Sequence, residues 1–98
     1  MAVQMVIELS NQQGAQTVVN ALENYKSRLR ASIERTRQRL SEFEKQYGKT
    51  TGQFLASMTA EDLRGGDLEF VEWAGEAKLL PGLERELEEL EHARYQLP

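Results

Sequence analysis

The sequence has no cysteine, a single histidine and no long hydrophobic run. Without cysteine the chain cannot form disulfides, thiolate zinc sites, Fe–S clusters or a Cys nucleophile. With His92 as the lone histidine, one chain cannot assemble a Ser-His-Asp arrangement. No apolar stretch approaches the ~20 residues of a membrane span, and Met1 to Leu9 lacks the charged start of a signal peptide. These absences predict a cytoplasmic, non-enzymatic protein with no cofactor and no membrane contact.

The composition is that of a small globular domain. The chain has 98 residues, of which 40% are hydrophobic and 7% aromatic. This length fits one domain over residues 1–98 and excludes a two-domain enzyme. Because a domain this small buries only a modest core, we expect a homodimer or a higher oligomer.

Residues 3–9 alternate between an apolar and a more polar face, which predicts a short β-strand. A lone strand leaves its backbone unpaired, so we expect a partner such as the same strand of a second chain. Residues 10–16 are polar and contain Gly14, so we expect a loop there; a frayed tail is the alternative for the whole segment 1–16. The apolar face of the expected strand consists of Val3, Met5, Ile7 and Leu9.

From residue 17 the apolar spacing changes to steps of three and four, which predicts a long helix over 17–48. Thr17 is the expected N-cap and Gly48 the expected stop. Such a helix is about 45 Å long, so we expect an elongated hairpin or bundle. The narrow apolar seam is typical of a coiled coil and is our candidate dimer interface. It consists of Leu22, Tyr25, Leu29, Ile33, Leu40 and Phe43.

Two further segments complete the expected fold. Residues 49–66 predict a short helix with a cap near Thr50, followed by a turn that ends at Gly65-Gly66. Asp67 is placed to cap an acidic helix over 67–98, which we expect to be kinked or broken at Pro81-Gly82. The fold class is therefore mainly α, with a short amino-terminal strand.

Charge is divided sharply along the chain. Between Lys26 and Arg39 six basic residues face one acidic residue, whereas eleven acidic residues face three basic ones between Glu61 and Glu91. We interpret this as an acidic helix packed antiparallel beside a basic one, within or between chains; an acidic face for a basic partner protein is the alternative. The sequence argues against nucleic acid as a ligand, because the arginines point in several directions around the expected helix and the pI is about 5.0. They are Arg28, Arg30, Arg35, Arg37 and Arg39.

A metal site is not expected either. Glu89 and His92 have the Glu-x-x-His spacing of carboxylate-bridged di-metal bundles, whose ligands point inward. Here Leu87 and Leu90 take the inward positions of the expected helix, which places Glu89 and His92 on its outer face.

Several short fragments resemble a family of small, mostly uncharacterised helical proteins of bacteria and archaea. The resemblance spans about residues 40–95 and is carried by Phe43-Glu44-Lys45-Gln46-Tyr47-Gly48, Phe54-Leu55 and Asp67-Leu68-Glu69-Phe70-Val71-Glu72-Trp73-Ala74. Members of this family often look like antitoxin components of toxin–antitoxin modules. The Pro81-Gly82 pair departs from the uninterrupted helix expected at this position.

The resemblance implies a cytoplasmic protein that binds and restrains a toxin encoded beside it. An acidic helix can occupy the basic groove of an RNA-cleaving partner, which is compatible with this function. Trp73 is either a core residue or a binding anchor. The expected partner-binding residues are Phe70, Trp73, Leu83, Leu87 and Leu90, with Glu84, Glu88 and Glu91 as the acidic complement.

Two alternatives from other classes remain. A dimeric regulator would insert its paired amino-terminal strands into DNA, with Gln4 reading bases, although Glu8 would repel phosphates. A structural helical adaptor with no toxin partner would use the helical seam alone.

Overall fold

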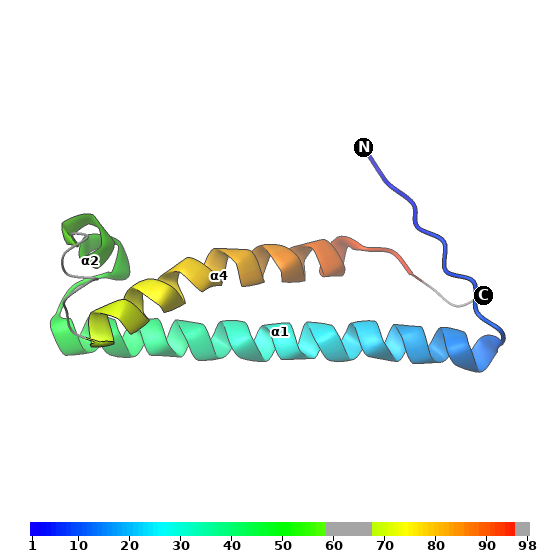
Figure 1. Cartoon of the computed structure of the whole chain (residues 1–98), viewed down its shortest axis with the longest axis horizontal. Helices are drawn as coiled ribbons and strands as arrows, with labels where there is room; N and C mark the ends of the chain where they lie inside the picture. Colours follow the sequence, from blue (N-terminus) through cyan, green and yellow to red (C-terminus); the bar gives the residue numbers. More distant parts are fainter. Residues whose placement is uncertain (59–67, 96–98) are drawn as a thin grey trace.

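A computed structural model describes residues 1–58 and 68–95. Within these residues the chain forms helices α1 (Gln12–Tyr47), α2 (Thr51–Ser57) and α4 (Leu68–His92). Helices α1 and α4 lie side by side and antiparallel, and α2 sits at the end where the chain turns back (Figure 1). The molecule measures 55 × 27 × 21 Å, and its radius of gyration of 19.1 Å exceeds the ~13 Å of a compact domain of this size. The expectation of a mainly helical, elongated molecule is confirmed.

The described residues contain no strand, so the predicted strand over residues 3–9 is not seen. The alternation of side chains is compatible with a strand, but a strand also needs a neighbour to accept and donate its backbone hydrogen bonds. No described segment of this chain supplies one. Residues 1–9 instead leave the start of α1 as an exposed segment, on the side where α4 lies (Figure 1).

Helix α1 begins at Gln12, so its cap lies six residues before the predicted cap at Thr17. Its N-cap is Asn11, whose side-chain oxygen accepts a hydrogen bond of 2.9 Å from the backbone N–H of Gly14. Thr17 lies inside the helix, where its hydroxyl donates to the carbonyl of Gln13. The polar stretch expected to be a loop is therefore helical, because Asn11 satisfies one of the free N–H groups at the helix start.

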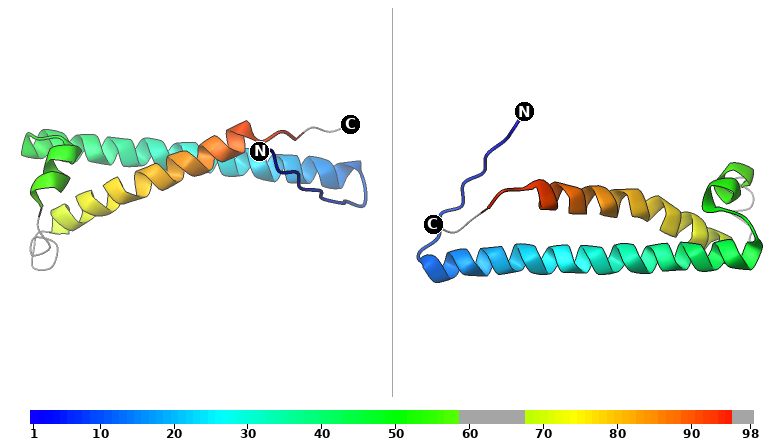
Figure 2. Two further views of the ribbon diagram at one scale, coloured as in Figure 1. Left: turned by 90° about the horizontal axis from the view of Figure 1, so that it is seen from above. Right: turned by 180° about the vertical axis from the view of Figure 1, so that it is seen from behind.

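A kink or a break was expected at Pro81-Gly82; the break is not found, since α4 is continuous from Leu68 to His92. Pro81 is exposed, so water can hydrate the carbonyl that loses its donor, and a bend in the helix relieves the clash of the proline ring. The ribbon of α4 does bend along its length, and from above it crosses α1 obliquely (Figures 1 and 2). The predicted Gly65-Gly66 turn and Asp67 cap lie outside the described residues.

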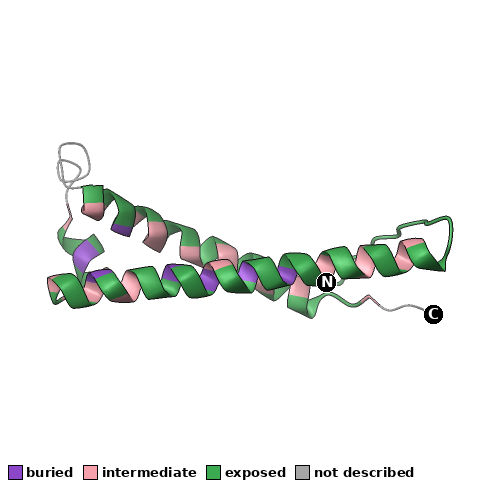
Figure 3. Cartoon of the chain, turned by 90° about the horizontal axis from the view of Figure 1, so that it is seen from below, coloured by how far each residue is buried: buried purple, intermediate pink, exposed green. Residues whose placement is uncertain are grey.

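One stripe of α1 faces the other two helices. Its buried members are Lys26, Leu29, Ile33, Thr36 and Phe43 (Figure 3). They lie three, four or seven residues apart, which is the spacing of a coiled-coil seam. The matching face of α4 has Trp73 buried and a row of half-buried leucines. That row is Leu80, Leu83, Leu87 and Leu90. The predicted seam of α1 is thus used within the chain.

Gly48 ends α1 in the left-handed region, with φ of +66°, and its N–H donates to the carbonyl of Glu44 at 2.9 Å. The predicted helix stop at Gly48 is confirmed, and the residue then directs the chain into α2. A Cβ at this position strains the backbone even though a side chain has free space there.

We expect Gly48→Ala to destabilise the chain by about 1 kcal/mol, because alanine pays a penalty for positive φ. Urea unfolding followed by circular dichroism measures this. Gly82→Ala is the matched control: Gly82 lies inside α4 with nothing within 4 Å of an added Cβ, so alanine there stabilises the helix. An unchanged midpoint for Gly48→Ala would contradict the assigned left-handed stop.

Candidate protein-binding surface

A cluster of aromatic rings joins all three helices at the closed end of the hairpin. Trp73 of α4 is 0% exposed and stacks on Phe54 of α2 at a centroid distance of 4.0 Å. On α1 it stacks on Phe43 at 5.5 Å and on Tyr47 at 5.7 Å. Phe70 adds edge and tilted contacts to Tyr47 and Phe54. Five of the seven aromatic residues of the chain therefore lie in this one cluster, and Phe43, Phe54 and Trp73 are its buried members.

Polar contacts fix α2 against this cluster. Thr50 and Gln53 form a reciprocal capping box at the start of α2. The N–H of Thr51 donates to the Glu44 carboxylate at 2.7 Å, and the Thr51 hydroxyl accepts from the indole Nε1 of Trp73 at 2.9 Å. Since Trp73 is fully buried, this hydrogen bond satisfies an indole N–H that water does not reach.

Ion pairs join the basic face of α1 to the acidic face of α4. Arg37 contacts Glu84 at 2.9 Å and Arg39 contacts Glu72 at 2.5 Å. A third pair, Arg30 with Glu91, has a separation of 3.7 Å. The antiparallel pairing of an acidic with a basic helix, predicted from the charge distribution, is confirmed within one chain. Each pair is half-exposed, so the pairs select the register of the helices more than they stabilise the fold.

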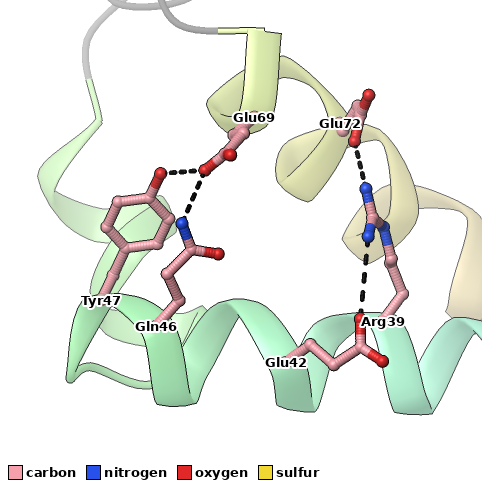
Figure 4. A network of polar contacts seen from close by, with 6 residues as sticks. All are labelled: Arg39, Glu42, Gln46, Tyr47, Glu69 and Glu72. Atoms are coloured by element: carbon pink, nitrogen blue, oxygen red, sulfur yellow. Dashed lines mark hydrogen bonds and ion pairs between the residues drawn. The ribbon is translucent and has the colours of Figure 1, made fainter.

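All three tyrosines of the chain donate their hydroxyls to glutamates across the hairpin. Tyr47 donates to Glu69, which also accepts from the amide of Gln46 at 3.0 Å (Figure 4). Tyr25 donates to Glu86, and this contact raises the pKa of the Tyr25 phenol because the neutral form keeps the hydrogen bond. These Tyr–Glu hydrogen bonds thus add to the ion pairs that join α1 to α4.

The third tyrosine closes the far end of the helix pair. Tyr95, just beyond α4, donates to Glu23, and the Lys26 ammonium lies 4.8 Å from the centre of the Tyr95 ring. Lys26 also contacts Glu23 at 3.4 Å. The hydrogen bond from Tyr95, and after it the one from Lys26, lowers the pKa of the Glu23 carboxyl. Lys26, although charged, is only 8% exposed.

The outer face of α4 carries apolar side chains that no described residue covers. Leu68 is 76% exposed and Leu79 is 58% exposed, with Val71 between them. Gly75 lies on the same face and lines a shallow hollow, in which an added Cβ would meet nothing within 4 Å. The other residues that line the hollow are Arg39, Glu72, Glu76, Lys78 and Leu79. We call Leu68, Val71, Gly75 and Leu79 the outer face of α4.

The residues predicted to bind a partner divide into two groups in the structure. Trp73 is buried in the core, and the other apolar members are half-buried between the helices. Among the acidic residues, Glu84 and Glu91 pair with α1, whereas Glu88 is exposed and lines a groove between the two helices. The half-buried members are Phe70, Leu83, Leu87 and Leu90.

The predicted dimer seam is divided in the same way. Leu29, Ile33 and Phe43 are buried, Leu22 and Leu40 are half-buried, and Tyr25 is exposed at the edge.

The arginines considered for nucleic acid do not form one surface. Arg30, Arg37 and Arg39 are engaged by glutamates of α4, and Arg28 and Arg35 are exposed elsewhere on α1.

Glu89 and His92 are both exposed, as their register predicts. Within residues 1–58 and 68–95, no three His, Cys, Asp or Glu side chains gather in a way that could hold a metal ion. In the same residues, no helix is long and apolar enough to cross a membrane.

Sequence reasoning missed Lys26 and the outer face of α4. Lys26 stands four residues after Leu22 and three before Leu29, so the heptad spacing indicates a seam position although the residue is charged. The signal for the outer face is a second apolar row at Leu68, Val71 and Leu79. Comparison of the chain with known protein families, with curated proteins and with solved structures finds no match.

We expect Thr51→Val to destabilise the chain by roughly 1–3 kcal/mol, because it leaves the buried indole N–H of Trp73 without an acceptor. Thr51→Ser keeps the hydroxyl and is the matched control. Urea unfolding followed by the fluorescence of the single tryptophan measures both. Equal stability of the two variants would show that the hydrogen bond contributes nothing.

We also expect the contact at Glu23 to weaken in acid. Its pKa is lowered from the ordinary value of 4.5 in the folded chain, so its stabilising effect is present above that value and is lost as the pH falls through the lowered pKa. An NMR titration of the Glu23 carboxyl carbon measures this pKa. Tyr95→Phe should move the pKa back toward 4.5, whereas the control Tyr25→Phe should not. An identical titration in all three proteins would refute the assignment.

Proposed function

We propose that this chain is a cytoplasmic, non-enzymatic protein-binding module of the antitoxin type, acting as a homodimer that binds and restrains a toxin encoded beside it. The observation that carries the proposal is the exposed apolar outer face of α4. A helix packed on one side is normally polar on the other, and exposed apolar patches often mark protein-binding sites. The resemblance over residues 40–95 supports the antitoxin class.

The shape of this face favours a protein partner. Leu79 lines the hollow at Gly75 together with Arg39 of α1, so a side chain of a partner can enter where α4 has none of its own. Leu68 and Val71 are exposed on the same helix. Gly75 costs helix stability at a site where an alanine would meet no described atom. A contact with a partner explains that cost, since close approach to a helix requires a small residue.

The charge around the face is mixed near the hollow and acidic further along α4. Glu72 is already paired with Arg39, and Lys78 lies at the rim. Toward the end of α4, Glu88 and Glu89 are exposed and make no hydrogen bond or ion pair with any described residue. The whole acidic helix was expected to complement the basic groove of an RNA-cleaving partner; in our proposal these two carboxylates supply that complement.

We expect Gly75→Ala to stabilise the free chain and to weaken partner binding. The new methyl adds up to about 1 kcal/mol of helix stability but fills the hollow, which costs roughly 1–3 kcal/mol in a packed interface, or about 5- to 150-fold in affinity. The experiment is co-expression with the adjacent gene product, followed by titration calorimetry of the purified pair. Thermal unfolding measures the effect on the free chain.

Gly82→Ala is the matched control, because Gly82 is an exposed glycine of α4 that does not line the hollow. It should stabilise the chain without changing the affinity. Equal affinities for both variants would exclude this face as the binding site. Two gene products that purify apart would refute the antitoxin proposal and favour the structural adaptor.

A further inference from the structure

The first nine residues leave both apolar side chains and backbone groups uncovered. Val3 is 90% exposed and Met5 is 82% exposed, and Val6 and Ile7 are exposed as well. No hydrogen bond joins residues 1–9 to any described residue. A segment with a strand-like pattern and an unpaired backbone is a ready site for pairing with another strand.

Contacts at the start of α1 fix the direction in which residues 1–9 leave the helix. Asn11 caps the helix through the N–H of Gly14, and the Leu9 Cβ would lie 3.4 Å from a Cβ placed at Gly14. Leu9 therefore packs against the first turn of α1. The residues before Leu9 extend away from α1 on the side where α4 lies (Figure 1).

We infer that residues 3–9 pair with the same residues of a second copy of this chain, as an antiparallel two-stranded ribbon centred on Val6. In this register residue i lies opposite residue 12 − i, so that Val6 faces Val6 across the two-fold axis. Gln4 then lies opposite the only charged residue of the segment, Glu8. Apolar pairs fill the other face: Val3 with Leu9, and Met5 with Ile7.

Self-complementarity selects a second copy as the occupant. One face of the ribbon becomes wholly apolar, with four side chains from each chain. On the opposite face the two Glu8 carboxylates are offset by four residues, about 14 Å along the strands, and each meets a Gln4 amide. A pairing centred on Glu8 would instead place like charges opposite each other.

The seam of α1 offers the apolar face of the ribbon a surface to pack on. Contacts from the end of α4 and from Tyr95 reach Arg30, Lys26 and Glu23. The seam continues past them toward the base of the segment. Its remaining positions are Ala15, Val18 and Leu22, which are half-buried. This surface matters because a two-stranded ribbon alone is marginally stable in water.

The inference rests on the homodimer of the proposed function and not on its toxin. It is therefore tested on the full chain alone, so that a failure of toxin binding leaves the result unaffected.

Single cysteine variants test the register, and the natural sequence has no cysteine to interfere. Paired residues of antiparallel strands have Cα atoms about 4.5–5.5 Å apart, within the range of a disulfide. Val6→Cys should therefore form a cross-linked dimer on oxidation. Met5→Cys and Ile7→Cys are the matched controls, because their partners are offset by two residues, about 7 Å along the strand, and should stay monomeric on a denaturing gel.

Charge variants test the same register in solution. Gln4→Glu places a like charge opposite Glu8 twice in the dimer, and Gln4→Lys places an opposite charge there. We expect the dimer dissociation constant to rise roughly two- to thirtyfold for Gln4→Glu and to fall for Gln4→Lys, as measured by sedimentation equilibrium.

Three results would overturn the inference. The first is a one-chain mass by light scattering at all concentrations. The second is preferential cross-linking at residue 5 or 7, which would show a different register. The third is a dimer that persists unchanged in Ile7→Asp, while circular dichroism shows the helices intact, because such a dimer forms through another surface.

Discussion

The burial of Trp73 is the constraint on which the rest of the structure depends. This one side chain contacts α1 and α2 while belonging to α4, and its indole N–H needs an acceptor that Thr51 provides. Helix α2 has seven residues, which is too short to be stable by itself. Its position therefore follows from the stacking of Phe54 on Trp73 and from the cap at its start. Helix α4 also begins at this cluster, so the cluster sets where α4 starts to run along α1.

Away from this cluster the two long helices are held by a thin interface. The four leucines of α4 that face α1 are only half-buried, and Lys26 and Thr36 occupy seam positions that leucine would fill in a tighter coiled coil. Such a seam does not by itself select one orientation of α4 relative to α1. The Arg–Glu pairs and the Tyr–Glu hydrogen bonds on its edges select the antiparallel orientation, because a parallel or shifted arrangement would separate the acidic half of the chain from the basic half.

Sequence patterns predicted the parts of this fold that depend on local spacing. The seam of α1, the stop at Gly48 and the short helix after Thr50 follow from heptad steps, from glycine chemistry and from capping. The helix start was misplaced because Asn11 and Thr17 have similar capping chemistry, and the polar residues between them resemble a loop. The strand was not found because a β pattern is realised only when a neighbour is present.

The candidate site was harder to predict than the fold, because apolar side chains form both the buried core and the exposed face proposed for binding. Spacing alone does not tell the buried Trp73 from the exposed Leu79, since which side of α4 meets α1 depends on the packing of the whole hairpin. In the same way, Glu84 and Glu91, two of the carboxylates expected to contact a partner, form ion pairs with α1. The acidic surplus of the sequence is therefore larger than the acidic surface of the structure.

The two uncovered apolar surfaces lie toward opposite ends of the hairpin, which bears on how one small chain can serve two partners. The outer face of α4 begins beside α2, whereas residues 1–9 leave the other end of α1 (Figure 1). Self-association through the amino-terminal segment, as inferred above, would therefore leave the outer face of α4 open. A dimer built in this way presents two identical faces, and a dimeric or closely spaced target would bind it with the added strength of two linked contacts. In such a dimer the long α1 would set the distance between each face and the dimer axis, which would give the elongated shape a role in the proposed function.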